Sequence, residues 1–406
     1  MARLPPALRP LWPYAKVLYT AATRAVAPAA QQLSRLRGGY LPRRVAASID
    51  DAVARAGRME VVRAGETIER VRPSGNPADH AVFTAQTREN VARAAVCLLP
   101  WGRVLSPHAA VITGTGELVE ELSPYFGTRR SSEHPLFLHP FPPPPTVIDD
   151  RLGVLATRGD SNYYHFLLDV LPRLGLLEQA ETIDQPVRWY APMATAFQRE
   201  LLDLIGIEPD NIVDSSTITH VQAAELIVAS LPDSHLRTPP WTVDFLRRRL
   251  LPLDAKRVPG KCIYVTRGRQ RHSRIVVNES EVLNALSRFD FEVVDPGRMS
   301  VVQQIRAFAQ AELIVAPHGA ALANLAFASP GAAVIELLAP DFVQGCYWKL
   351  ADCVPGLRYR YLIRNERQAS PERMRGVASD INVDITALTR MLDELSNLGD
   401  DTRAVC

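Results

Sequence analysis

The stretch ELIVAPHGAALANLAFASPGAAVIELLAP, Glu312 to Pro340, shows most clearly how the chain folds. An apolar run ends at Ala316, and His318 lies just beyond it. Small residues then lead to a second apolar run, which carries Glu336. Apolar runs of this length, separated by a helix-sized segment, are typical of a strand, a helix and a second, parallel strand. The stretch therefore predicts a parallel sheet, with a helix over residues 319–328.

The same alternation of strand and helix extends back to residue 151. Predicted strands lie at 152–157, 187–192, 224–230, 262–267, 291–295, 312–317 and 332–338. Predicted helices lie at 162–180, 196–207, 241–252, 278–289, 300–310 and 319–328. The segment PLDAKRVPGK, residues 252–261, reads as a linker between two halves. We therefore predict two α/β halves with doubly wound parallel sheets, in which ligands bind beyond the carboxyl ends of the strands.

The sequence predicts four regions along the chain. They are a basic N-terminal arm (1–48), an N-terminal acceptor-side α/β domain (49–255), a C-terminal Rossmann-like domain (256–375), and a C-terminal helix and tail (376–406). Within the second of these, three segments before residue 135 read as short strands: RMEVVRAG, HAVFTA and HAAVITGTGELVEEL. We expect the C-terminal helix, residues 385–398, to pack on the first half of the chain.

Composition excludes several classes of protein. Hydrophobic residues make up 47% of the 406 residues and charged residues 22%, so the chain can bury a core and is not disordered. The net charge of +2, without a zinc-finger or RNP pattern, argues against a nucleic-acid-binding protein. Five scattered cysteines without a CxxC pair support neither a zinc site nor a disulfide framework, and they fit a reducing cytoplasm.

The first 49 residues carry eight basic side chains and no acid, with Trp12, Tyr14 and Tyr19 among them. The sequence has no run of eighteen or more apolar residues that could form a transmembrane helix. One interpretation is an arm, residues 1–45, that lies on an anionic membrane surface. The alternative is a flexible basic leader without such a role.

The turn after the predicted strand 312–317 has the composition of a phosphate-binding turn. A helix N-terminus presents unpaired N–H groups, and a preceding glycine lets an anion come close. Gly319, Ala320 and Asn324 are therefore donor-binding candidates together with His318, and Glu336 could accept hydrogen bonds from ribose hydroxyls. The alternative is tight helix–sheet packing. Neither a GxGxxG fingerprint nor a P-loop is present.

A second cluster, YVTRGRQRHSR, places four arginines after the predicted strand 262–267. Arginine side chains bind phosphate oxygens through two parallel hydrogen bonds. Their position beyond the carboxyl end of the strand favours Arg267 and Arg274 over the others. The alternative is a solvated surface loop.

A third cluster, DSNYYHFLLDVLPRL, contains His165 and Asp169 four residues apart on a predicted helix that Pro172 should kink or break. A carboxylate one turn from an imidazole can orient the ring as a general base. A structural pair is the alternative. The spacing would also suit two metal ligands, but no third ligand is evident, so no metal is expected.

With these three clusters assembled, the chain resembles glycosyltransferase family 61, which includes capsular-polysaccharide, xylan-decorating and O-linked N-acetylglucosaminyl transferases. The resemblance spans roughly residues 150–340. It implies a GT-B arrangement, in which two Rossmann-like domains face each other across a cleft, and an inverting reaction without a tightly held metal. It assigns the donor diphosphate to Arg267, Arg274 and the turn after His318, the nucleotide ribose to Glu336, and the acceptor side to His165 and Asp169.

The resulting hypothesis is a cytoplasmic or peripheral membrane enzyme of surface-polysaccharide synthesis. It would transfer a hexosyl or pentosyl group from a nucleotide sugar to a glycan or lipid-linked acceptor, with His165 as base and Asp169 as the other candidate. Two alternatives stay open. One is another transferase on the same scaffold, such as a pyruvyl transferase, and the other is a non-catalytic binder of sugar nucleotides or glycans.

Overall fold

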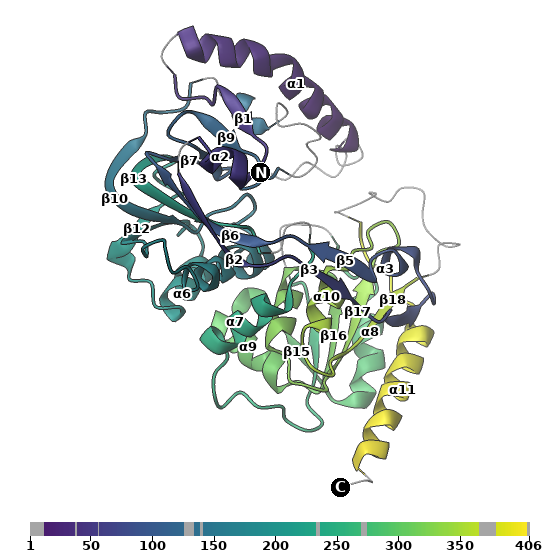
Figure 1. Ribbon diagram of the computed structural model, residues 1–406. Helices are drawn as coiled ribbons and strands as arrows, with labels where there is room; N and C mark the ends of the chain where they lie inside the picture. The colour runs from purple at the N-terminus through teal and green to yellow at the C-terminus, as the bar shows by residue number, and fades with distance from the viewer. Residues whose placement is uncertain are drawn as a thin grey trace. The chain divides into compact units, whose positions relative to one another are not determined.

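The computed structural model describes residues 12–36, 39–55, 57–125, 134–138, 141–232, 236–268, 274–364 and 379–403 (Figure 1). The chain forms two compact units. The N-terminal unit contains the described residues of 12–66 and 91–232, and the C-terminal unit contains those of 67–90 and 236–403. The mixed α/β class predicted from the sequence is confirmed, whereas the GT-B arrangement and the four predicted domain ranges stay predictions.

The N-terminal unit is organised around one sheet with parallel and antiparallel pairs. Its strands are β1 (Arg44–Ala46), β2 (Arg58–Arg63), β6 (Ala94–Pro100), β7 (Arg103–Leu105), β8 (Ala110–Ile112), β9 (Glu117–Val119), β10 (Thr146–Val154), β11 (Arg188–Ala191), β12 (Ile212–Asp214) and β13 (His220–Ala229). Its helices are α1 (Trp12–Leu36), α2 (Ile49–Val53), the 3₁₀ helix η3 (Pro135–Leu138), α4 (Tyr163–His165), the π-helix η4 (Phe166–Val170), α5 (Pro172–Leu177), α6 (Ala196–Leu204) and the 3₁₀ helix η5 (Pro209–Asn211).

The C-terminal unit alternates strands with helices. Its strands are β4 (Ser74–Asn76), β14 (Cys262–Val265), β15 (Phe291–Val294), β16 (Leu313–Pro317), β17 (Ala333–Leu338) and β18 (Arg358–Ile363). Its helices are α3 (Ala81–Thr84), α7 (Pro240–Leu250), α8 (Glu279–Leu286), η6 (Ser287–Phe289), η7 (Pro296–Arg298), α9 (Val301–Gln310), η8 (Ala320–Phe327), α10 (Cys346–Asp352) and α11 (Ile385–Arg403). A ribbon of β3 (Glu66–Glu69) and β5 (Arg88–Val91) contains two of the points where the chain passes between the units.

The main sheet of the N-terminal unit has the strand order β1-β9-β8-β7-β13-β10-β11-β12. Strand β10 is parallel to both β11 and β13. The chain leaves β10 for β11 and β12 on one side and then crosses to β13 on the other side. The order of the strands therefore reverses at β10, and the segment that carries His165 begins just beyond the carboxyl end of this strand.

The sheet of the C-terminal unit has the order β15-β14-β16-β17-β18-β4, and all its paired strands are parallel. Here the order reverses between β14 and β16, because the chain moves from β14 outward to β15 and then returns across it. Such a switch point leaves a crevice beyond the carboxyl ends of the two strands. Arg267 follows β14 at this edge, and His318 follows β16.

The C-terminal helix α11, yellow in Figure 1, packs within the C-terminal unit and not on the first half of the chain, so that expectation is wrong. Leu388 and Leu392 are completely buried with Val282 of α8 and Tyr264 of β14. The reason is the apolar stripe of α11, which completes the layer that α8 begins on this face of the sheet.

The segment HAVFTA, residues 80–85, contains helix α3 with its two caps and not the predicted strand. The His80 side chain caps the helix by accepting a hydrogen bond from the Val82 N–H. Phe83 is buried and stacks on Tyr361 of β18, with ring centroids 4.3 Å apart. Phe83 also contacts the rings of Trp348 and Tyr359, so aromatic contacts with distant elements hold this segment, and local propensity does not reveal them.

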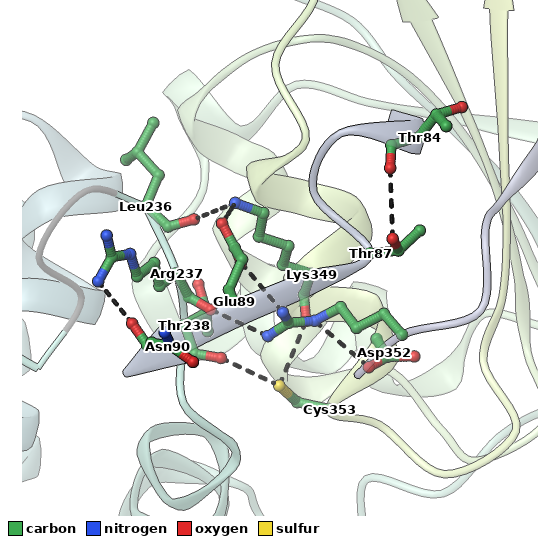
Figure 2. A network of polar contacts seen from close by, with 11 residues as sticks. Thr84, Thr87, Glu89, Asn90, Leu236, Arg237, Thr238, Lys349, Asp352 and Cys353 are labelled. Atoms are coloured by element: carbon green, nitrogen blue, oxygen red, sulfur yellow. Dashed lines mark hydrogen bonds and ion pairs between the residues drawn. The ribbon is translucent and has the colours of Figure 1, made fainter. Parts of the chain in front are cut away.

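A buried polar network fixes the β3–β5 ribbon to α10 within the C-terminal unit (Figure 2). Arg70 donates to Glu89 at 3.1 Å and to the Arg237 carbonyl at 3.0 Å, and it lies 3.4 Å from Asp352. Lys349 of α10, 3% exposed, donates to the same Glu89 at 2.6 Å. In the sequence, residues 67–90 lie between two stretches of the N-terminal unit. The network explains why they nonetheless belong to the C-terminal unit.

Candidate active site

The carboxyl edge of the C-terminal sheet brings together residues that the sequence separates by about fifty positions. The Arg267 guanidinium donates from Nη1 to the His318 carbonyl oxygen over 2.8 Å. A Cβ atom at Gly319 would lie 2.2 Å from the same Nη1. A side chain at this position would therefore displace the Arg267 guanidinium, whereas the backbone angle makes no demand, since the φ of 178° is extended backbone. Arg267, His318 and Gly319 meet as the sequence predicted.

Arg274 lies close enough to Arg267 for the two guanidinium groups to repel each other. Burial first, and then this repulsion, lowers the pKa of Arg267 to about 10, and burial also lowers the pKa of Arg274. The Nε atoms of both side chains are buried without a hydrogen-bond partner in the described part of the chain. Two partly buried cations with unused donors are a favourable place for an anion.

The backbone around Arg274 is specifically held. Its φ of 85° is unusual for a residue other than glycine. The Asp380 carboxylate accepts hydrogen bonds from the N–H groups of Arg274 and Ile275, at 3.0 and 3.2 Å. The guanidinium lies over the Phe342 ring, 5.3 Å from its centroid. Asp380 and Phe342 are therefore supports of this cluster that the sequence did not reveal.

Glu336 is completely buried, and both its oxygens already accept hydrogen bonds. One accepts from His318 Nδ1 at 2.5 Å and the other from the Tyr359 hydroxyl. Burial and the neighbouring Glu336 charge raise the pKa of Tyr359 well above its usual value, so this hydroxyl stays a donor. This geometry favours Glu336 as the group that orients His318, and it does not favour the predicted contact with a ribose.

The segment after Gly319 is the 3₁₀ helix η8 and not the predicted α-helix over 319–328. Its first residue, Ala320, is partly exposed at the edge of the sheet. Asn324 is fully buried, and its amide donates to Gln304 of α9 at 3.2 Å and to the Ala321 carbonyl at 3.0 Å. Asn324 therefore connects η8 to α9, away from the cluster of cations.

The N-terminal unit holds the second candidate cluster. His165 Nδ1 lies 2.7 Å from Asp169 Oδ2, and their side chains are 18% and 11% exposed. The intervening turn is a π-helix, in which the Leu171 N–H donates to the Phe166 carbonyl. Pro172 begins the next helix, where its missing N–H is tolerated. The expected break at the proline is thus a wider turn, and turns of this type are frequent at functional sites.

Two further charged residues adjoin this pair, and the sequence analysis missed both. Arg173 is 1% exposed, donates to the Ala156 carbonyl at 3.0 Å, and attracts both Asp169 and Asp160. Burial raises the pKa of Asp160 to about 6, although Arg173 and His165 oppose the shift. The signal for Arg173 was its position four residues after Asp169, which continues the same helical face.

The loop after β10 passes close to the His165 ring at Gly159, where a side chain would crowd the ring. A Cβ at Gly159, whose φ is 103°, would lie 3.1 Å from His165 Cδ2. The Gln198 side chain of α6 holds the loop by donating to the Asp160 carbonyl at 2.9 Å. The imidazole is therefore positioned from two sides, by Asp169 and by the loop that follows β10.

Residues 163–335 match the model of a protein family described as Glycosyltransferase 61. This part of the chain is therefore similar to glycosyltransferase family 61. The resemblance inferred from the three motifs is thus confirmed, and the family implies glycosyltransferase activity. No curated protein matches the chain.

The glycosyltransferase 61 region covers both clusters, from the helix of His165 and Asp169 to the β16–η8 turn, and it ends one residue before Glu336. Among the described residues, no three histidine, cysteine, aspartate or glutamate side chains lie together so that they could hold a metal ion. No helix in the described ranges is long and apolar enough to cross a membrane.

Proposed function

We propose that the protein is an inverting glycosyltransferase that moves a hexosyl or pentosyl group from a nucleotide sugar to a hydroxyl group of a glycan or a lipid-linked acceptor. The observation that carries this proposal is the Arg267–Arg274 pair. Two partly buried guanidinium groups, for which no carboxylate ion pair is found in the described residues, lie at the switch point of a doubly wound sheet. The diphosphate of a nucleotide sugar supplies the negative charge that such a position favours.

His165 is the proposed general base. Its Nδ1 bonds to Asp169, so the proton on Nδ1 points at the carboxylate and Nε2 is left as the acceptor. As the acceptor oxygen attacks the anomeric carbon, its proton passes to Nε2, and the bond from the anomeric carbon to the phosphate oxygen breaks. The nucleoside diphosphate leaves with the electron pair of that bond. Asp169 then stabilises the imidazolium that forms, and Arg173 and Asp160 complete the charge balance around it.

Arg267 and Arg274 are the proposed partners of the leaving diphosphate. Positive charge held in a partly desolvated position stabilises charge that develops in the transition state more than the same charge does in water. The His318 imidazole and its partner Glu336 keep the β16–η8 turn in place, so that the His318 carbonyl can hold Arg267.

Release of nucleoside diphosphate tests this function. The protein is incubated with a panel of nucleotide sugars, with and without oligosaccharide acceptors, and product is detected by mass spectrometry. We expect one donor class to be consumed in an acceptor-dependent manner. Binding of a nucleotide sugar without turnover would indicate the non-catalytic alternative. Thermal stabilisation by phosphoenolpyruvate and not by nucleoside diphosphates would indicate a pyruvyl transferase.

We also propose that the enzyme works in the cytoplasm at the inner face of the membrane, in synthesis of a capsular or other surface polysaccharide. Val17 and Leu18 of α1 are 68% and 70% exposed, whereas Ala27 and Ala30 are buried against η3. The first part of α1 therefore offers exposed apolar side chains to an anionic lipid surface. Replacing Lys16 and Arg24 by Glu tests this, because the change keeps the buried part of α1. Loss of flotation with anionic liposomes is expected, and unchanged flotation would contradict the proposal.

A further inference from the structure

Strand β15 lies beside β14 at the outer side of the C-terminal sheet, and the two strands end at the same level. Val265 is paired with Val294, and the Thr266 N–H donates to the Val294 carbonyl at 2.9 Å. The next residue on the β15 side is Asp295, and the next residues on the β14 side are Arg267 and Gly268. An acidic side chain is thus placed one position away from the proposed diphosphate-binding arginine.

The contact between Asp295 and Gly268 is close. A Cβ at Gly268 would lie 2.9 Å and 3.1 Å from the two carboxylate oxygens of Asp295, so a larger residue would displace them. The φ of Gly268 is 51°, and its N–H donates to the Thr266 hydroxyl at 3.2 Å. The turn after β14 therefore exposes bare backbone to the Asp295 carboxylate.

The Asp295 carboxylate has hydrogen-bonding capacity left. Its Oδ1 accepts from the Gly297 N–H at 3.0 Å and caps η7. Its Oδ2 lies 3.6 Å from the Nε of Arg298, a side chain that is 85% exposed. A carboxylate offers about four acceptor positions, and the Asp295 side chain is 29% exposed, so it can accept bonds from a ligand.

We propose that Asp295 binds the ribose hydroxyls of the donor nucleotide, and that the protein therefore requires a ribonucleoside diphosphate sugar. This inference rests on the proposed function, because it places the ribose next to the diphosphate at Arg267. In doubly wound sheets, an acid at the end of the strand next to the phosphate-binding turn hydrogen-bonds the ribose hydroxyls. Glu336 is a poorer candidate, since His318 and Tyr359 occupy both its oxygens.

The alternative is that Asp295 only caps η7. The substitution Asp295→Ser separates the two roles, because serine is also a good helix cap but is too short to reach a ligand beyond Gly268. The control is Glu292→Gln, which removes one negative charge from the middle of the same strand, where the side chain is 62% exposed.

The experiment measures, by calorimetry, the affinity of the full chain for the ribonucleoside diphosphate that it binds best and for its 2′,3′-dideoxy counterpart. For the unchanged protein and for Glu292→Gln, we expect the dideoxy compound to bind about 10–100-fold more weakly, the scale of a hydrogen bond to a charged group. Asp295→Ser should bind the two compounds equally. Both affinities should lie within about threefold of the affinity of the unchanged protein for the dideoxy compound.

Equal affinities of the unchanged protein for the two compounds, or discrimination retained in Asp295→Ser, would overturn the role of Asp295 and leave the diphosphate site in place. Absence of any nucleoside diphosphate binding would overturn the donor site and this inference together. Should Asp295→Ser not fold, the isosteric Asp295→Asn provides the same comparison, with discrimination expected to fall at least about threefold.

Discussion

Each unit of the protein holds a histidine joined through Nδ1 to a carboxylate, and the two pairs differ in what surrounds them. His165 and Asp169 are 2.7 Å apart with 18% and 11% of their side chains exposed, whereas His318 and Glu336 are 2.5 Å apart with 7% and 0% exposed. Asp169 Oδ1 has no hydrogen-bond partner among the described residues. Both oxygens of Glu336 accept hydrogen bonds, one from His318 and the other from the Tyr359 hydroxyl.

The difference indicates which pair can move a proton. An imidazole that reaches solvent, with a carboxylate that retains an unused acceptor, can accept a proton and be stabilised as imidazolium. A pair that is fully buried and saturated holds the backbone in place and exchanges protons with difficulty. In the proposed mechanism, the same two residue types therefore serve as a base in one unit and as a support for the donor site in the other.

The largest expected effect is on turnover, and it distinguishes the two pairs. His165→Ala should lower kcat by about 10²–10⁴-fold, the usual contribution of a general base, with nearly unchanged affinity for nucleoside diphosphate. Steady-state kinetics and calorimetry on the same preparation measure both quantities. If His165 is only structural, the melting temperature will fall while kcat per folded molecule stays the same.

The next effect is on the free energy of unfolding, and it should be larger for the His318–Glu336 pair than for the His165–Asp169 pair. Glu336→Ala leaves His318 and the Tyr359 hydroxyl buried without their partner, so the free energy of unfolding should fall by about 3–5 kcal/mol. Asp169→Ala, in a more exposed pair, should cost about 1–3 kcal/mol. Chemical denaturation of both variants checks the order. A larger loss in Asp169→Ala would contradict the distinction between a support and a base.

A smaller effect concerns the donor site alone. Arg267→Ala should weaken binding of nucleoside diphosphate by about 1.5–3 kcal/mol, the scale of a charge-assisted hydrogen bond. Arg288→Ala removes the same charge from an exposed position in η6 and serves as the control. Unchanged affinity in Arg267→Ala, or an equal loss in Arg288→Ala, would remove Arg267 from the donor site.

The smallest effect is a pH dependence of stability near His165. The pKa of Asp160 is raised by burial from 3.8 to about 6, so the folded state holds this proton more tightly than the unfolded state. The contribution of Asp160 to stability therefore falls as the pH rises from about 4 to about 6. Melting temperatures of the wild type should decline relative to Asp160→Asn over this window. A constant difference between the two proteins would show that Asp160 titrates at its ordinary pKa.

The alternating part of the fold could be predicted from the sequence, because its strands are short apolar runs separated by helix-length segments, and α6 and α9 begin with capping boxes. The strands β14 to β17 and the helices α8 and α9 lie where they were expected. The departures depend on contacts that no local pattern contains. Residues 81–84 are helical because Phe83 packs against aromatic rings of distant elements, and α11 covers α8 because the α8 face of the sheet is otherwise open.

The candidate site was predictable to the same extent. Residues at the ends of adjacent parallel strands must lie together, and this brings Arg267 to His318. The burial of Glu336 was not predictable, since it depends on Tyr359 from a neighbouring strand. Asp295 was overlooked for a related reason, because its closeness to Gly268 follows from the pairing of β14 with β15 and not from a motif.

The most direct test of a single displacement with His165 as base is the anomeric configuration of the first product. Proton NMR of the product formed from the donor identified by the panel distinguishes α from β linkages, which do not interconvert once the glycoside has formed. Attack by a hydroxyl that His165 deprotonates must invert the configuration, so a β-linked product is expected from an α-linked donor. A first product that retains the donor configuration would contradict this mechanism and the role of the His165–Asp169 pair.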